Sequence, residues 1–150
     1  MSRFAGKWVD DLPAGKCTNF DKFVKALELT EEEIAGYRDY TGGHLTTVNG
    51  DEWSYTYEFG GLSKTNHFKI NITNPKDTDI EGNEFVNTPK LDPSNPNKMV
   101  EMTKTWRPNG SIMTTKMERT LNETGDKQYT ELTHIESGVT IKSTMSKVVV

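Results

Sequence analysis

The sequence is poor in the residues that build metal centres and covalent cross-links. It has one cysteine among 150 residues, Cys17, so an internal disulfide is excluded. Its histidines, His44, His67 and His134, are isolated, and the sequence has neither a metal-spaced Cys/His cluster nor a glycine-rich phosphate loop. From these absences we expect no metal, no cofactor and no catalytic activity. We expect Cys17 to be a structural or incidental thiol, and His67, which precedes Phe68 in a predicted strand, to lie on an outer face.

Long hydrophobic runs and blocks of like charge are also missing. Hydrophobic residues make up 33% of the chain, and none of their runs has the length of a membrane span. Lys plus Arg number 18 and Asp plus Glu number 22, giving a formal net charge of −4. Because the basic residues are scattered singly, nucleic acid is not an expected partner.

The cellular location follows from two weak signals. Residues 1–11 contain no apolar core of a secretory signal, and a single thiol suits a reducing compartment, so we expect a cytoplasmic protein. Three N-glycosylation triplets, at Asn71, Asn109 and Asn122, keep secretion open as the alternative.

The aromatic content and the residue pattern argue that this polar chain folds. Aromatic residues are 9% of the sequence, and several stretches alternate between apolar and polar side chains. A low hydrophobic fraction then fits a mostly β protein in which every strand has one polar face. The length fits a single domain over residues 1–150.

One early stretch has the pattern of two short helices. Asn19 can cap a first helix, whose apolar positions have the spacing of one buried face: Phe20, Phe23, Val24 and Leu27. Thr30 and Glu33 form a capping-box pair at the start of a second helix, which we expect to end near Gly36.

The rest of the chain predicts strands joined by tight turns. The clearest is Trp53–Phe59, preceded by a hairpin turn at Asn49-Gly50. Pro89 predicts an edge strand or a bulge. The other expected strands are His44–Val48, Phe68–Ile72, Glu84–Leu91, Met99–Trp106, Ser111–Leu121, Tyr129–Ile135 and Val139–Val149.

Alternate residues of these strands predict which side chains face inward. On the last strand Val139, Ile141, Ser143 and Met145 share a face, and after Gly110 the shared face holds Met113, Thr115, Met117 and Arg119. In the strand Trp53–Phe59 the shared face is aromatic, which suits either a filled core or the lining of a cavity.

Arg119 is the anomaly on an otherwise apolar face. A buried arginine needs a partner, because an unpaired guanidinium in the interior is costly. The sequence leaves its partner open among a structural acid, ordered water and the anionic head of a ligand. A position at the strand end, in contact with solvent, is the remaining alternative.

Several motifs resemble those of the intracellular lipid-binding proteins, which include the fatty-acid-binding and cellular retinoid-binding proteins. The similarity covers nearly the whole chain. It is carried by Phe4-Ala5-Gly6-Lys7-Trp8, the segment Asn19–Leu27, Asn49-Gly50-Asp51, Lys104-Thr105-Trp106 with Thr114-Thr115, and Gly138–Val148.

The resemblance implies a ten-stranded antiparallel up-and-down β-barrel of the calycin type, capped by a helix-turn-helix lid. It implies a monomeric carrier of a small hydrophobic ligand, a fatty acid or a retinoid-like molecule, with transient membrane contact through the lid. Phe20 and Val24 would face the portal, Phe59 would approach the lid, and Trp8 would close the far end.

The carboxylate site of the family is only partly present. Ser143 and Met145 stand where the family has an arginine and a tyrosine, and Arg119 matches the second arginine after a one-residue shift. The alternative is a protective barrel of the heat-soluble type, which needs no ligand. The expected ligand-binding set is Arg119, Ser143, Met145, Ile141, Met117, Thr115, Tyr55, Tyr57, Phe59, Phe20 and Val24.

Overall fold

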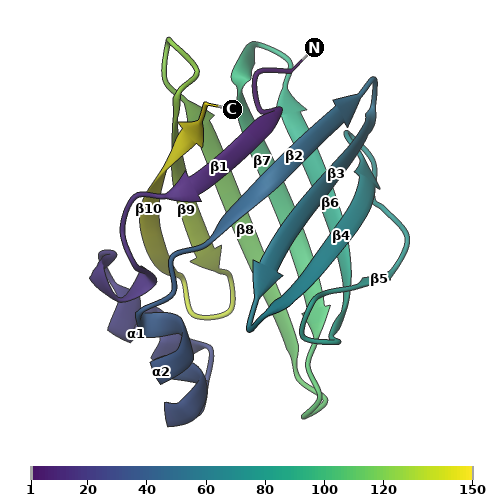
Figure 1. The fold of residues 1–150 in the computed structure, drawn as a ribbon. Coiled ribbons are helices and arrows are strands. Elements are labelled where there is room, and N and C mark those ends of the chain that lie inside the picture. Colours follow the sequence, from purple (N-terminus) through teal and green to yellow (C-terminus); the bar gives the residue numbers. More distant parts are fainter. Residues whose placement is uncertain (1, 150) are drawn as a thin grey trace.

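Antiparallel strands follow one another around a nearly closed barrel in the computed structural model, which describes residues 2–149 (Figure 1). They form one ten-stranded sheet in the order β4-β3-β2-β1-β10-β9-β8-β7-β6-β5. The all-β barrel expected from the sequence is therefore confirmed. The strands are β1 Gly6–Asp10, β2 Gly43–Asn49, β3 Glu52–Phe59, β4 Leu62–Lys69, β5 Asp77–Thr78, β6 Glu84–Asp92, β7 Asn95–Trp106, β8 Ile112–Leu121, β9 Lys127–His134 and β10 Val139–Val148.

Two short helices follow β1 and cover one end of the barrel, while residues near both chain ends lie at the other (Figure 1). They are α1, Phe20–Ala26, and α2, Glu31–Arg38, preceded by a single 3-10 turn at Ala14–Lys16. Across residues 2–149 none of the helices is long and apolar enough to cross a membrane.

The capping predictions for the helices are half right. Thr30 and Glu33 form the reciprocal capping box, with hydrogen bonds of 3.1 and 3.2 Å. The helix predicted to end near Gly36 continues two residues further, to Arg38. Asn19 is the N-cap residue of α1, as predicted, but its side chain makes no capping hydrogen bond: this residue has φ 69°, and its Nδ2 donates to the carbonyl of Thr140 at 3.0 Å instead. Asn19 thus ties the start of α1 to β10.

The predicted strand Phe68–Ile72 ends early. Strand β4 stops at Lys69, because Asn71 takes φ 66° and turns the chain, which leaves Ile72 44% exposed. His67 lies exposed on the outer face of this strand, as predicted. Pro89 lies on β6 where that strand pairs with β7 alone, so the edge predicted from this proline is confirmed.

Side chains close the seam between β4 and β5, the two edges of the sheet. Nδ2 of Asn66 donates to Oδ2 of Asp77 at 2.9 Å and to the carbonyl of Thr78 at 3.0 Å. Further along, the buried Asn74 pairs with both backbone groups of Lys69, at 2.7 and 3.0 Å, as a neighbouring strand would. These amides replace the backbone ladder that the seam lacks.

The hydrophobic core fills the end of the barrel opposite the helices. Trp8 is fully buried, and its indole nitrogen donates to the carbonyl of Phe4 at 2.9 Å. The core cluster consists of Phe4, Trp8, Trp53, Phe68, Ile70, Met99, Leu121 and Met145. Because this end is packed solid, any space for a ligand must lie nearer the helices.

Candidate functional site

The inner faces of β7 to β10 form rows of paired residues that run from the lid toward the core. The β7–β8 turn is at the lid end, because Arg107 donates to the carbonyl of Leu27 at the end of α1. The first of three successive rows is Thr103, Thr115, His134 and Val139, the next is Glu101, Met117, Leu132 and Ile141, and the third is Met99, Arg119, Thr130 and Ser143. The prediction that Thr115, Met117 and Arg119 share one face of β8 is thus confirmed. So is the prediction that Val139, Ile141 and Ser143 share one face of β10.

Arg119 lies inside the barrel, and its partner is a structural acid. Its Nε donates to Oε1 of Glu101 at 3.1 Å, and the two side chains are 12% and 10% exposed. Its Nη1 donates to Oε1 of Gln128 at 2.8 Å. The guanidinium carbon stands 5.6 Å from the centre of the Tyr55 ring, and Oη of Tyr55 donates to the same Glu101 oxygen at 2.7 Å. Oε1 of Glu101 therefore accepts hydrogen bonds from both Arg119 and Tyr55.

Burial and charge shape the titration of this cluster. Burial raises the pKa of Tyr55 well above its ordinary value, and the charge of Glu101 adds to this, so Tyr55 stays a donor. Burial, followed by the charge of Arg119, lowers the pKa of His44 to about 3, so its imidazole is neutral at pH 7. Burial also raises the pKa of Asp10, which accepts a hydrogen bond from the backbone nitrogen of Gly42 at 2.9 Å.

Gln128 carries an unused donor. The residue is 1% exposed, and its Oε1 accepts from Arg119. Within residues 2–149, its Nε2 atom has no hydrogen-bond partner. A buried polar group without a partner is uncommon in folded proteins and asks for an explanation.

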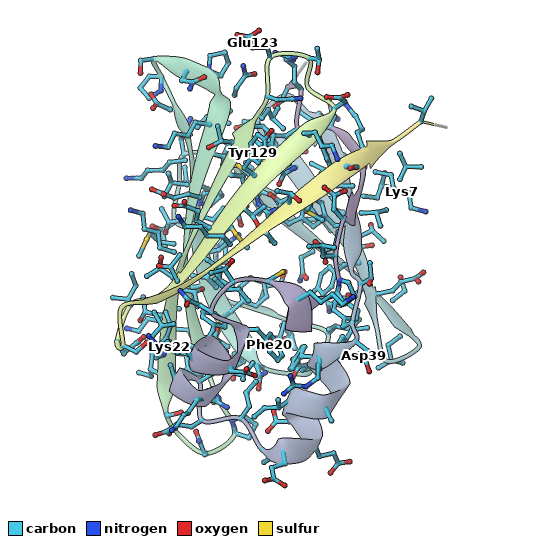
Figure 2. The ribbon with its side chains drawn as sticks, turned by 90° about the vertical axis from the view of Figure 1, so that its left-hand side faces the viewer. Lys7, Phe20, Lys22, Asp39, Glu123 and Tyr129 are labelled. Carbon is cyan, nitrogen blue, oxygen red and sulfur yellow. The ribbon has the colours of Figure 1, made fainter. Side chains whose placement is uncertain are left out.

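A cavity of about 440 Å³ lies between the lid and the barrel, and its lining is mainly apolar but includes the charged residues Glu33, Asp79, Glu81 and Arg107. The helix side contributes Phe20, Phe23, Val24 and Leu27, and the barrel side contributes Thr105, Met113, Leu132 and Ile141. Figure 2 shows Phe20 on the barrel side of the lid and Lys22 on its outside, in agreement with their burial. Leu132 and Ile141 share a register row with Glu101, so the cavity reaches the row next to Arg119.

Aromatic contacts and one polar bridge hold α2 over the cavity mouth. The ring of Phe59 on β3 stacks on Tyr37, with centroids 5.1 Å apart, and meets the edge of Tyr40 at the same distance. Oη of Tyr37 donates to Glu81 of the β5–β6 loop. Because Tyr37 and Glu81 both line the cavity, α2 is held at its edge by contacts that a moving helix could break.

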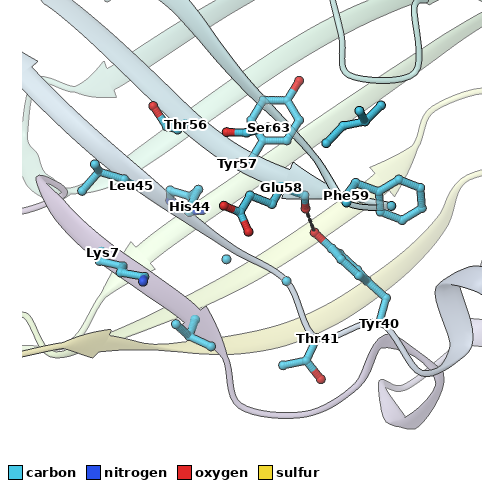
Figure 3. A pocket seen from close by; sticks show the side chains of 16 residues that line it. Lys7, Tyr40, Thr41, His44, Leu45, Thr56, Tyr57, Glu58, Phe59 and Ser63 are labelled. Carbon is cyan, nitrogen blue, oxygen red and sulfur yellow. Dashed lines mark hydrogen bonds between the residues drawn. The ribbon is translucent and has the colours of Figure 1, made fainter.

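A second hollow, of about 570 Å³, lies at the rim where β1, β2 and β3 meet the linker after α2 (Figure 3). Its lining mixes polar and apolar residues, among them Lys7, Leu45, Thr56 and Glu58. Oη of Tyr40 crosses it to donate to the carbonyl of Glu58 at 2.6 Å. This hollow is less suited to an apolar guest than the cavity under the lid.

The structure divides the predicted binding residues among three places. Phe20, Val24 and Ile141 line the cavity, and Phe59 lies at its mouth. Arg119 and Tyr55 belong to the polar cluster, with Met117, Thr115 and Ser143 on the neighbouring inner face. Met145 lies in the solid core, and the hydroxyl of Tyr57 donates to Oδ1 of Asn66 at the seam, at 2.8 Å. Met145 is therefore distant from the cavity, while Tyr57 lies near Asp79 and Glu81, which line it.

Sequence reasoning missed Glu101 and Gln128. Glu101 alternates with Met99 and Thr103 on β7, so its inward position was readable from the same parity that singled out Arg119. Gln128 precedes Tyr129, which is 49% exposed on the outer face (Figure 2). Nothing in the sequence signals that these two side chains meet Arg119, because their meeting depends on register between strands.

Solved structures show that the barrel is the fatty-acid-binding-protein fold at low sequence identity. A Schistosoma mansoni fatty acid binding protein in complex with arachidonic acid has a TM-score of 0.76 and 19% identity, covering 99% of this chain and 98% of that one. The REP1-NXSQ fatty acid transporter has a TM-score of 0.73 and 19% identity, and the match covers 97% of this chain and 96% of that one. Echinococcus granulosus fatty-acid-binding protein 1 has a TM-score of 0.74 and 17% identity, and the match covers 99% of this chain and 100% of that one. No protein-family model and no curated protein sequence matches the chain.

Proposed function

We propose that this protein binds a small hydrophobic lipid inside its barrel and carries it through water without any catalytic step. The observation that carries the proposal is the cavity of about 440 Å³, which has a mainly apolar lining under α1. A lipid chain matches that lining and would pack among Phe23, Val24 and Leu132. The volume lies in the range of roughly 300–1,000 Å³ that small-molecule sites occupy.

The similar solved structures support the proposal. Their titles describe fatty acid transport, fatty acid binding and a complex with arachidonic acid. A protective barrel without a ligand, the alternative left by the sequence, has no observation in its favour. A fatty acid and a retinoid-like molecule are both compatible with the apolar lining of the cavity.

The proposal extends to the setting in which the carrier works. We place the protein in the cytoplasm as a monomer, with the free thiol of Cys17 suited to a reducing compartment. Loading would involve brief contact of the lid with a membrane. Lys22 and Lys25, on the exposed side of α1, would meet anionic head groups there.

Displacement of a neutral fluorescent dye tests the proposal. Delipidated protein should bind Nile red, and oleic acid, oleyl alcohol or retinol should displace it. The Met113→Trp variant fills the cavity and should lose at least about tenfold in dye affinity, which corresponds to about 1.4 kcal/mol. Thr114→Trp places the same ring on the outer face of β8 and should bind normally. Equal binding by both variants, or no displacement by any of the three lipids, would refute the proposed site.

A further inference from the structure

One arginine, Arg107, lines the cavity under the lid from the start of the β7–β8 turn. It continues the inward alternation of Thr103 and Thr105 on β7. Backbone hydrogen bonds of 2.9 Å with Ser111 and Gly110 fix its place in the turn. Across residues 2–149, no lysine and no other arginine contributes to the lining of this cavity. Arg107 is therefore the cation that a bound ligand would meet.

The guanidinium of Arg107 is half-buried and carries a charge that no acid compensates. Its Nη1 donates to the carbonyl of Leu27, where a cation also meets the negative end of the α1 dipole. Within the described residues, no carboxylate forms an ion pair with it. Arg119 differs, because Glu101 already holds it and it does not line the cavity. Since a guanidinium has several N–H donors, one bond to a carbonyl leaves Arg107 able to bind an anion.

Three carboxylates line the same cavity from α2 and the β5–β6 loop, and each already accepts hydrogen bonds from the protein. Glu33 closes the capping box of α2, Asp79 accepts from two backbone nitrogens of its own loop, and Glu81 accepts from Tyr37. Glu33 and Glu81 are exposed, so water weakens their repulsion of an anion more than it weakens a direct contact with half-buried Arg107. These acids therefore confine an anionic head group to the side of Arg107.

Apolar side chains lead from Arg107 into the barrel. Met113 lies in the first inward row beyond the turn, and Leu132 and Ile141 lie two rows deeper. The solid core closes the far end of the barrel. Pro108, beside Arg107, lines the cavity and is exposed, so this part of the cavity is close to water. A chain that packs along the apolar rows therefore leaves its head group at the rim.

We propose that the cavity binds an anionic amphiphile with its head group at the lid, on Arg107, and its chain toward the core. This inference rests on the proposed function, and it names the head-group class and the binding direction at the same site. Arg107 is the residue that selects the negative head group. Because that head group stays near water, a large anion fits there as well as a carboxylate does.

Lipids that share one chain and differ in their head groups test the charge preference. Delipidated protein loaded with Nile red is titrated with oleic acid, oleyl alcohol and oleylamine at about pH 8, where the carboxylic acid is ionised and the amine is protonated. We expect oleic acid to displace the dye at the lowest concentration. Tighter binding of oleylamine overturns the inference, because the carboxylates would then hold the head group, and tighter binding of oleyl alcohol also overturns it.

The Arg107→Gln variant tests the residue. It keeps a donor for the carbonyl of Leu27 but removes the charge, so the affinity for oleic acid relative to oleyl alcohol should fall at least about tenfold. Lys104→Gln removes the same charge from the outer face of β7, where Lys104 lies 5.7 Å from the centre of the Trp106 ring, and its affinity ratio should not change. An unchanged ratio in Arg107→Gln, shown to be natively packed by near-ultraviolet circular dichroism, overturns the inference.

N-oleoyltaurine tests the binding direction, because its sulfonate head is larger than a carboxylate. With the head at the lid, it should bind within about tenfold of oleic acid and weaken in Arg107→Gln. Weaker binding than that to the unmodified protein would place the head inside the barrel and overturn the inference, while lipid binding stands. If none of the four lipids displaces the dye, the proposed function fails and the inference fails with it.

Discussion

Arg119 and Glu101 meet diagonally across two strands, with Nε and Oε1 3.1 Å apart, although the direct register partner of Arg119 is Met99. Strands β7 and β8 thus bring a cation and an anion together inside a barrel whose inner face there mixes apolar residues such as Met117 with polar ones such as Thr130. A buried pair of this kind contributes little net stability, but each member needs the other. That asymmetry makes the pair testable by single and double substitutions.

Removing one member of the pair should destabilise the barrel strongly. Glu101→Ala leaves a buried guanidinium without its partner and should lower the free energy of unfolding by about 3–5 kcal/mol. The double variant Glu101→Met with Arg119→Met should recover most of that loss, because no charge remains to be compensated. Urea unfolding measures both. The half-exposed pair of Lys116 and Glu118 is the control, and Glu118→Ala should cost less than about 1 kcal/mol. Equal losses at Glu101 and Glu118 would contradict the burial of the first pair.

His44 should make the barrel sensitive to acid. Its pKa is about 6.5 unfolded and about 3 in the folded protein, so unfolding takes up a proton below the unfolded value. His44 therefore leaves the free energy of unfolding unchanged above about pH 6.5, and lowers it progressively as the pH falls toward 3. The loss is on the order of 5 kcal/mol in full, at about 1.4 kcal/mol per pKa unit.

The histidine contribution can be isolated by difference. Urea unfolding of the unmodified protein and of His44→Gln at stepped pH should show a flatter acid limb in the variant. His67 is exposed on the outer face of β4, so His67→Gln should leave that limb unchanged. Parallel acid limbs for all three proteins would contradict a neutral His44 in the folded barrel.

Asn74 should be essential to the seam beside β4. Asn74→Ala removes the acceptor of the Lys69 backbone nitrogen and the donor to its carbonyl, so we expect a loss of roughly 2–3 kcal/mol in the free energy of unfolding. Thr56→Ala breaks a hydroxyl pair on the outer face of β3 and should cost about 0.5 kcal/mol. Denaturant titration distinguishes the two, and similar small losses would show that the seam needs no such amide.

Tyr37 should control how fast a lipid leaves. Tyr37→Phe keeps the stacking on Phe59 but loses the hydrogen bond to Glu81, which spans the cavity mouth. We expect release of bound Nile red, followed by stopped-flow fluorescence, to be several times faster, with a smaller change in equilibrium affinity. This scale corresponds to one hydrogen bond of about 1 kcal/mol. Tyr129→Phe alters an exposed tyrosine of β9 and should release the dye at the normal rate; if both variants release it equally fast, the contact at Glu81 does not gate the cavity.

The sequence predicts those features that depend on short-range pattern. Alternation placed Met117 and Arg119 on one face, and the Thr30 and Glu33 pair marked the start of α2. The predictions that failed depend on backbone twist: Asn19 and Asn71 both adopt positive φ, which no local spacing reveals. The partner of Arg119 was out of reach for a different reason, because it depends on which residues of β7 and β8 come opposite one another.

The seam gives this chain an unusual freedom in how it can be connected. Strands β1 and β10 are paired through Lys7 and Val148, so the first and last strands of the chain are neighbours, while β4 and β5, the edges of the sheet, are joined by side chains. A circular permutant could therefore link the present ends with a short loop and open the chain near Gly82, where an added Cβ would meet open space. Such a protein would keep every pair of hydrogen-bonded strands and change only the order in which the strands are synthesised.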